Sequence, residues 1–498
     1  MADYVLIFFI TLAFNLVVTL LSSSRLCAAK VSSGEHDQGS AEEIRSHKRI
    51  MRDYLVVYLL ATVSDWLQGA YVYALYDAYG YSQYSIAILF VAGFGSSMLF
   101  GTYIGGMADW GGCRRFILIY TLIYGASCIT KHFDNFAILI LGRLLGGIAT
   151  SLLFSIFEAW LIRSHADAKL GKNFLSRSFS SAAYGNAIVA IIAGLVANNA
   201  ATATTMEPVF GDLIYIGGYL NPFDIAILAL ILCGLYCASI REDGIPNAKG
   251  NKTTISSKEE EHGESEGVRS TWYGGLKNAV ITTIRSRDIL LCGIVSSLFE
   301  GSMYIFVFMW TPALKALSGD TPPPLGLIFS AFMVACMAGS SLFSIFSTRL
   351  QDEVVLIGVL LTATLSMIVI AIGSTDVSLL VGMLLFELCI GMYFPVMGIL
   401  KGSIVPEDRR AAIYNLYRIP LNFIVLFSLL ADVSPTFSFI LNAVMLSIAT
   451  ILQGILMVRR LNLYRMTFYK ERKQRQRLSS DSSKEETISL VMVDEIEP

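Results

Sequence analysis

The sequence predicts an all-α membrane protein made of two six-helix bundles with pseudo-two-fold symmetry, plus one extra N-terminal transmembrane helix. Three observations lead to this fold class: the composition, the length of the apolar runs, and a repeat between the two halves of the chain. Of the 498 residues, 54% are hydrophobic and 15% are charged, whereas an ordinary soluble domain carries about 25% charged residues. Such a chain lacks the polar surface that a water-soluble globule needs.

Apolar runs long enough to cross a bilayer recur along most of the chain. A hydrocarbon core about 30 Å thick needs roughly 20 helical residues, and runs of that length are too long for barrel strands. Because backbone groups in lipid must pair within their own segment, the spans are predicted to be helices. The twelve principal spans are predicted at 54–79, 84–107, 116–130, 136–162, 180–200, 222–240, 289–314, 325–346, 354–372, 378–400, 411–431 and 436–458.

A further apolar run, 4–21, precedes these twelve. A cleaved signal peptide is the alternative, since Ala28 and Ala29 follow the run. However, the residues before it include Asp3 and neither Lys nor Arg, and the run is longer than the apolar core of a typical signal peptide. We therefore predict an uncleaved extra helix.

A polar stretch divides the twelve spans into two sets of six. Residues 241–287 are rich in Lys, Glu, Ser and Gly, which is typical of a disordered linker, and a short interfacial helix is predicted around 272–284. The predicted order is an extra helix with its cytoplasmic connector, an N-terminal bundle, a cytoplasmic linker, a C-terminal bundle and a disordered cytoplasmic tail. Their ranges are 1–50, 51–240, 241–287, 288–463 and 464–498.

Basic residues predict the orientation, because Lys and Arg collect in cytoplasmic loops. They follow the second, fourth, eighth and tenth spans and recur in the tail from Arg459 to Arg477, whereas the opposite loops carry only Lys131 and Lys315. The linker and the C-terminus are therefore predicted to be cytoplasmic. No organelle signal is recognisable, so the plasma membrane is the default expectation.

The two halves of the chain repeat each other. A shift of 235 residues, 300 minus 65, aligns the starts of the first and seventh spans and carries Asp65 onto Glu300. A shift of 244 residues, 387 minus 143, carries Arg143 onto Glu387. Parallel six-helix repeats joined by a long loop are typical of secondary transporters, whose site lies at the membrane midplane between the halves.

Charged side chains deep in the spans are few, and each is a functional candidate. An ionised group that faces lipid costs about 2.5–3.5 kcal/mol or more, so these groups must face a cavity or a partner. A purely structural role, in which Asp65 or Glu300 neutralises an arginine, is the alternative. The candidate proton-coupling or counter-ion residues are Asp65, Glu300, Glu387 and Glu158.

The turn after the second span carries a motif. "GGMADWGGCRR", residues 105–115, consists of glycine, three residues, aspartate, and then glycine and basic residues. It resembles the loop signature of the major facilitator superfamily, although Trp110 and Cys113 stand where that family usually has basic residues. The resemblance implies a gating loop formed by Gly105, Asp109, Arg114 and Arg115.

Longer motifs are similar to the molybdate-anion transporter branch of that superfamily. They are "SDWLQ", "GRLLGG", "LLFSIFEAW", "LFEGSMYIFVFMWTP", "LGLIFSAFM", "YFPVM" and "YRIPLN", and the resemblance extends over residues 54–458. The extra N-terminal helix also resembles that branch. The resemblance implies uptake of molybdate.

The residue types permit an independent check of that implication. Molybdate is a tetrahedral dianion, so a site for it needs cations and hydrogen-bond donors held away from bulk water. Arg143 and Arg418 are the basic residues predicted deep in the spans, and arginine offers five donors in a rigid fork. Aromatic donors are also available, although at helical spacing they more often serve packing. The candidate substrate-binding residues are Arg143, Arg418, Trp66, Gln68, Tyr304, Trp310, Tyr393 and Asn422.

A count of charges suggests how transport is driven. Two arginines set against ionised Asp65, Glu300 and Glu387 sum to minus one, which would repel a dianion. Because burial disfavours the charged form of a carboxyl group, one of these acids is expected to carry a proton. We therefore predict uptake of the oxyanion together with protons. Facilitated diffusion or exchange, with the acids serving only as counter-ions, is the alternative.

Other functions stay open or are excluded. A non-transporting nutrient-sensing membrane receptor is an alternative from another class, and sulfate or an organic anion is an alternative substrate. The sequence contains no nucleotide-binding loop, metal cluster or catalytic triad, so we expect no enzyme activity, cofactor, metal or nucleic-acid partner. The expected partners are the oxyanion, protons and the lipid bilayer, and the oligomeric state stays open.

Overall fold

The computed structural model describes residues 2–33, 40–209, 213–240, 272–318, 322–406, 409–431 and 433–462. Within these ranges it leaves out the side chains of residues 2, 24–33, 102–111, 172, 272–278, 411 and 412. The helices are α1 (Ala2–Ser33), α2 (Ala41–Gly69), α3 (Val72–Ala78), α4 (Gln83–Gly111), α5 (Cys113–Thr130), α6 (Phe136–Asp167), α7 (Lys172–Ala203), η1 (Gly218–Leu220), α8 (Asn221–Ser239), α9 (Trp272–Arg285), α10 (Arg287–Leu317), α11 (Leu325–Phe346), α12 (Asp352–Ile372), α13 (Asp376–Ile404) and α14 (Arg410–Leu430).

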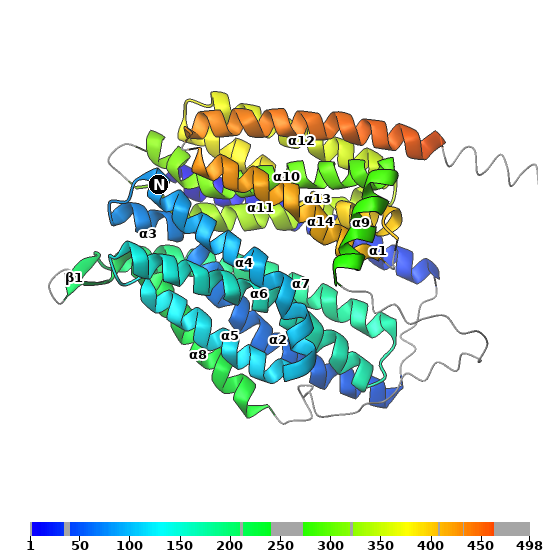
Figure 1. Ribbon diagram of the computed structural model, residues 1–498, viewed down its shortest axis with the longest axis horizontal. Coiled ribbons are helices and arrows are strands. Elements are labelled where there is room, and N and C mark those ends of the chain that lie inside the picture. Colours follow the sequence, from blue (N-terminus) through cyan, green and yellow to red (C-terminus); the bar gives the residue numbers. More distant parts are fainter. Residues whose placement is uncertain are drawn as a thin grey trace, which may run out of the picture.

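Two helical bundles make up most of the molecule, as the sequence predicts (Figure 1). α2 to α8 form the N-terminal bundle, and α10 to α14 with the last helix, Pro435–Asn462, form the C-terminal bundle. Among the described residues, 11 helices are long and apolar enough to cross a membrane, or 12 if the bent pair α2 and α3 is one span. α5, whose first turn contains Arg114 and Arg115, is not among them, yet it packs between α6 and α8.

The first predicted span, 54–79, consists of two helices. α2 ends at Gly69, α3 begins at Val72, and the two are bent by 41°. Glycine is a weak helix former because its backbone loses more conformational freedom on folding than that of other residues. The break therefore falls at a residue that weakens a continuous helix. α2 also begins before the predicted span, at Ala41, where Ser40 and Glu43 form a capping box.

Matching glycines explain part of the sequence repeat. The 244-residue shift also carries Gly147 of α6 onto Gly391 of α13. A Cβ at Gly147 would lie 1.9 Å from Ser96 Oγ of α4, and one at Gly391 would lie 1.9 Å from the Cys336 carbonyl oxygen of α11. Glycine alone allows these approaches, so α4–α6 and α11–α13 are equivalent close-packed pairs in the two bundles.

A short hairpin marks one end of the molecule. β1 (Glu207–Val209) pairs antiparallel with β2 (Ile214–Ile216) between α7 and α8. We call this the hairpin end, and the opposite end, which carries α9, the linker end (Figure 1). α9 confirms the short helix predicted around 272–284.

The extra helix α1 lies along the C-terminal bundle. It packs against α11, Tyr4 Oη donates to Asp376 Oδ2 at 3.1 Å, and the hydroxyl groups of Thr19 and Ser341 are 3.2 Å apart. The helix predicted from the apolar run 4–21 is therefore present, and it continues to Ser33.

The two bundles meet at the hairpin end. α7 packs against α11, and α3 packs against α10. Lys315 of α10 donates to Asp77 of α3, and Gln83 Nε2 of α4 donates to the Val433 carbonyl at 2.9 Å. α3 ends and α4 begins at this end, so an ion pair and an amide hydrogen bond hold the bundles together there.

Candidate functional site

Asp65 of α2 turns into the N-terminal bundle. Tyr124 of α5 donates its hydroxyl to Asp65 Oδ1. The neighbouring Tyr120 donates to the Ala61 carbonyl at 3.0 Å and packs against Tyr124, with ring centroids 5.6 Å apart. The aspartate in the middle of an apolar helix therefore has a tyrosine partner within its own bundle.

Glu300 of α10 is held by three donors. Its Oε1 accepts from Ser296 Oγ at 2.7 Å, Lys401 Nζ at 3.0 Å and Tyr393 Oη at 3.1 Å. Tyr393 is fixed in turn by stacking on Phe299, with ring centroids 3.8 Å apart. α13 continues to Ile404, so Lys401 is helical and reaches across to α10.

The two aligned carboxylates therefore differ in their partners. Asp65 and Glu300 both accept from a tyrosine of their own bundle, but Tyr124 lies on α5 and Tyr393 on α13. Glu300 also has a cation, Lys401, whereas the bond to Asp65 comes from a neutral hydroxyl. The cation that neutralises Glu300 is a lysine rather than an arginine.

Arg143 of α6 lies beside α4. Its Nε donates to the Leu89 carbonyl at 3.1 Å, and its guanidinium carbon lies 4.6 Å from the centroid of the Phe90 ring. Lys131, the residue after α5, is 2% exposed, and its Nζ lies 5.6 Å from the centroid of the Tyr76 ring. Lys131 was expected in an outer loop, but it is buried close enough to Arg143 for the two charges to interact.

Four aromatic rings lie where the bundles meet, and we call them the aromatic layer: Phe90, Phe94, Tyr304 and Phe308. Phe90 and Phe308 have centroids 5.2 Å apart, as do Phe94 and Tyr304, so each contact joins α4 to α10. Arg143 contacts Phe90, and the exposed Arg418 lies close enough to Tyr304 for its charge to act on the phenol. The structure therefore puts the two predicted arginines against different members of the layer.

The other two predicted acids lie elsewhere. Glu387 of α13 is 6% exposed and lies beside Cys336 of α11, within the C-terminal bundle. Glu158 of α6 is exposed and lies nearer the linker end. Among the described residues, no group of three or more His, Cys, Asp or Glu side chains is arranged to hold a metal ion.

Some of the predicted neutral donors already donate hydrogen bonds to other groups of the protein. Trp66 Nε1 donates to Asn186 at 2.8 Å, and Gln68 Nε2 donates to the Ser64 carbonyl at 2.9 Å. The remaining contacts are Trp310 against the Phe332 ring, Tyr393 on Glu300, Tyr304 in the aromatic layer, and Asn422 beside the sulfur of Met98.

The predicted gating loop is described only in part. Gly105 and Asp109 belong to α4, but their side chains lie outside the described residues. Arg114 donates to the Ala238 carbonyl at the end of α8, and Arg115 is exposed.

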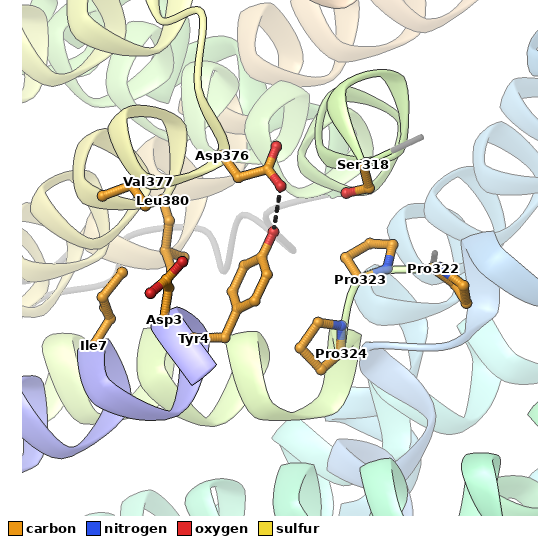
Figure 2. Close-up of a pocket in the computed structure, with 10 residues that line it drawn as sticks. All are labelled: Asp3, Tyr4, Ile7, Ser318, Pro322, Pro323, Pro324, Asp376, Val377 and Leu380. Atoms are coloured by element: carbon orange, nitrogen blue, oxygen red, sulfur yellow. Dashed lines mark hydrogen bonds between the residues drawn. The ribbon is translucent and has the colours of Figure 1, made fainter. Parts of the chain in front are cut away.

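A pocket of about 310 Å³ opens at the hairpin end, between α1 and the C-terminal bundle (Figure 2). Tyr4 points across the pocket to Asp376. Asp3 lies beside Tyr4 on α1, and three consecutive prolines, 322–324, lie on the other side of Tyr4. Two carboxylates make this pocket unsuited to an anion, and it is separate from the aromatic layer.

Sequence reasoning missed Lys131, Lys401 and Tyr124. Lys401 carried a detectable signal, because it follows Tyr393 by eight residues, 401 minus 393, a spacing that keeps two side chains on one side of a helix. Lys131 carried none, since a lysine between two spans is normally an exposed loop residue.

Known proteins have similar sequences. Residues 14–393 match the model of a family described as sugar transporters with 12 transmembrane segments. A molybdate-anion transporter of Danio rerio is 34% identical over 432 residues, which cover 84% of this chain and 86% of that protein. The chain belongs to the molybdate-anion transporter branch of the major facilitator superfamily. Another member of the branch, from Takifugu rubripes, is 33% identical over 79% of this chain and 82% of its own length.

Solved structures of major facilitator transporters share the fold. A peptide transporter POT in complex with sulfate aligns with a TM-score of 0.64 at 14% identity, covering 84% of this chain and 95% of that one. A mutant of the nucleoside transporter NupG aligns at 0.62 and 13% identity, covering 82% and 99%. These likenesses concern the fold alone. The branch membership and the apolar helices make the protein a multi-pass integral membrane transporter.

Proposed function

We propose that this transporter carries molybdate across the membrane by alternating access. Its relatives at about one-third identity are molybdate-anion transporters, and the charges around the aromatic layer suit a dianion. The charges around the aromatic layer carry the proposal, because they do not depend on the names of the relatives.

The groups near the aromatic layer have a surplus of positive charge. Glu387 does not contribute, because it faces α11. Four cations oppose two carboxylates, which leaves two positive charges when every group is ionised: Arg143, Lys131, Arg418 and Lys401 against Asp65 and Glu300. The count from the sequence was negative because it assigned both lysines to loops and included Glu387. With them included, a dianion is attracted without a protonated acid.

Proton coupling is then proposed to act through Glu300. While Glu300 is ionised, Lys401 is bound to it at 3.0 Å. Protonation of Glu300 removes the charge that holds Lys401, and the freed ammonium becomes available to the anion. One proton thereby makes one more cation available, which would couple the two movements. Facilitated diffusion or exchange remains the competing scheme.

Alternating access requires the two ends to open in turn. Contacts between the bundles close the hairpin end, whereas Glu158 and Arg418, which lie nearer the linker end, are exposed. Positive charge in the linker-end loops favours a cytoplasmic position for that end, with the plasma membrane as the default location. We assign this conformation to the inward-facing state.

Two other substrates are weighed against molybdate. The family description names sugars, but a neutral sugar gives no reason for a surplus of cations in the membrane, where unpaired charge is costly. Sulfate has the same charge and shape as molybdate, so side-chain identity does not separate the two. Competition by sulfate is therefore part of the test.

The test is uptake of labelled molybdate into proteoliposomes, with sulfate as competitor, with and without a pH gradient. We expect Arg143→Gln and Arg418→Gln each to reduce uptake on the order of tenfold or more, because a charge-assisted contact to the anion is lost. Arg49→Gln, at an exposed residue of α2, is the control and should keep wild-type uptake.

The possible outcomes separate the competing schemes. Molybdate uptake that sulfate inhibits, but that falls equally in Arg143→Gln, Arg418→Gln and the control Arg49→Gln, would contradict the assigned roles. Binding of molybdate without any uptake would support the receptor alternative. Uptake that ignores the pH gradient in both the wild type and Glu300→Gln would remove proton coupling.

A further inference from the structure

Two buried polar groups at the hairpin end lack hydrogen-bond partners. Lys131 is 2% exposed and Tyr76 is fully buried, and neither Lys131 Nζ nor Tyr76 Oη has a partner among the described residues. Lys131 Nζ lies 5.6 Å from the centroid of the Tyr76 ring, so the two groups occupy the same region. Buried donors are nearly always satisfied, and a buried ammonium without a partner is especially unfavourable.

A second cation lies beside them. A Cβ at Gly142 would be 3.2 Å from Lys131 Nζ, so the ammonium lies against α6 at the residue just before Arg143. The charge of Arg143 acts on both Lys131 and Tyr76. Arg143 uses Nε for the Leu89 carbonyl, and no described residue accepts from its two terminal nitrogens. Two neighbouring cations repel each other, and an anion between them would offset that repulsion and accept from the spare donors.

The surrounding groups do not supply that anion. The other titratable groups that act on this region are Cys128, one turn before Lys131, and two carboxylates that act on Cys128, Asp65 and Asp224. Asp65 is bound by Tyr124, and Asp224 lies 3.1 Å from His132 Nε2. Tyr79 Oη donates to the Lys131 carbonyl at 2.6 Å, which fixes the backbone and leaves the ammonium free.

We propose that Lys131, Tyr76 and Arg143 form a second anion-binding subsite, on the hairpin side of the aromatic layer. Ammonium and guanidinium offer only donors and carry positive charge, and the phenol can add a further donor, so the ligand is an anion and not a cation or a sugar. Because Lys131 and Tyr76 are buried, an anion that reaches both has to be compact, as a small inorganic anion is. The subsite rests on the proposed function only for the identity of that anion, which is the transported oxyanion.

The subsite differs from the group around Arg418 and Lys401. Phe90 contacts Arg143 on one flank of the aromatic layer, and Tyr304 lies near Arg418 on the other. An anion that passes between the ends of the transporter would therefore meet two cationic groups in succession. The hairpin-end subsite lies behind the Asp77–Lys315 contact, next to the closed end.

The experiment measures the thermal midpoint of the purified, detergent-solubilised protein against concentration of sodium molybdate, sodium sulfate and sodium chloride. Molybdate is expected to raise the midpoint of the wild type. Lys131→Met should need on the order of tenfold more molybdate for the same rise, because one charged donor is lost. Tyr76→Phe, which removes only a hydroxyl, should show a smaller change in the same direction. Lys48→Met, at an exposed residue of α2, is the matched control.

Each outcome decides between the possibilities. Equal molybdate dependence in wild type, Lys131→Met and Tyr76→Phe would overturn the subsite, as would a wild type that no anion stabilises. If Lys131→Met does not fold, Tyr76→Phe decides. A response to chloride equal to that of molybdate would assign the subsite to halide and overturn its role for the oxyanion. If molybdate raises the thermal midpoint of the wild type but the wild type takes up no molybdate, the proposed function is contradicted and the subsite still stands.

Discussion

Glu300 shows how a charged residue is tolerated inside an apolar helix. Ser296, Tyr393 and Lys401 all donate to the same oxygen, at 2.7, 3.1 and 3.0 Å. The side chains of Glu300 and Lys401 are 21% and 18% exposed, so the pair is largely shielded from water. Removing one partner of such a pair leaves the other charge poorly solvated, and the loss exceeds that of an exposed pair.

We expect Lys401→Met to lower the free energy of unfolding by about 1–3 kcal/mol, because Glu300 is left without its cation. The double variant Glu300→Gln with Lys401→Met should recover part of that loss, since a neutral amide needs no counter-charge. Thermal unfolding of the detergent-solubilised protein measures both. Strictly additive effects of the two substitutions would show that the residues do not interact.

His132 offers a pH-dependent contact outside the membrane spans. Its Nε2 lies 3.1 Å from Asp224 Oδ1, and its Nδ1 lies 3.0 Å from the Tyr215 carbonyl. Burial lowers the pKa of His132, but the bond to Asp224, the Tyr215 carbonyl and the charge of Asp224 raise it, and the net shift is upward from 6.5. The protonated ring therefore ties the α5–α6 loop to β2 and α8.

The stabilising effect of His132 is complete below its unfolded pKa and is lost as the pH rises through its raised folded pKa. We expect His132→Gln to cost about 0.2–1 kcal/mol near pH 6 and less near pH 8. Thermal midpoints of both proteins at the two pH values provide the measurement. A difference in thermal midpoint between wild type and His132→Gln that does not change with pH would show that the ring is not protonated in the folded protein.

At the scale of the elements, the helices could be predicted because lipid forces long apolar segments to be helical. The break between α2 and α3 could not, because only packing decides whether a glycine such as Gly69 bends a helix. The α4–α6 and α11–α13 contacts could be anticipated as paired glycines, Gly147 and Gly391. Their partner helices follow only from the fold.

The same limit applies to the candidate site. Arg143 and Glu300 could be named from the cost of charge in lipid, and both are in position to interact with charged or aromatic neighbours. Lys131 could not, because it stands at a helix end where a lysine is usually solvated, and the spacing that puts Lys401 on the same side of α13 as Tyr393 does not reveal its contact with Glu300. Their burial depends on contacts with other helices, which no local pattern encodes.

We expect Gly147→Ala and Gly391→Ala each to destabilise the protein by about 1–3 kcal/mol, because the added methyl group overlaps the facing helix. At Gly147 the overlap includes the Gly93 carbonyl at 2.3 Å, and at Gly391 the Cys336 carbonyl at 1.9 Å. Gly358→Ala is the control, since a Cβ there meets nothing within 4 Å. Thermal unfolding compares the three, and equal midpoints would contradict the close packing.

At the scale of the whole molecule, the contacts between the bundles control which end is open. Asp77 and Lys315 join α3 to α10 at the hairpin end, and their side chains are 40% and 28% exposed. A pair that exposed contributes up to about 1 kcal/mol. Such a small contribution suits a contact that has to break in every transport cycle.

Lys315→Met should therefore shift the protein toward the conformation open at the hairpin end, by about twofold to fivefold in population. A cysteine introduced at Phe308 reports this, through its rate of reaction with a membrane-impermeant thiol reagent applied from the hairpin side. The charge-swapped pair Asp77→Lys with Lys315→Asp should restore the slow rate. An unchanged rate in Lys315→Met would remove the pair from the gate.

The attachment of α1 has a practical consequence. Its side-chain hydrogen bonds to the rest of the protein go to Asp376 and Ser341, both in the C-terminal bundle. A donor fluorophore fused before Ala2 therefore moves with that bundle. An acceptor dye at the β1–β2 hairpin moves with the N-terminal bundle. Energy transfer between the two dyes would fall each time the hairpin end opens, which would give a continuous optical record of turnover from single molecules.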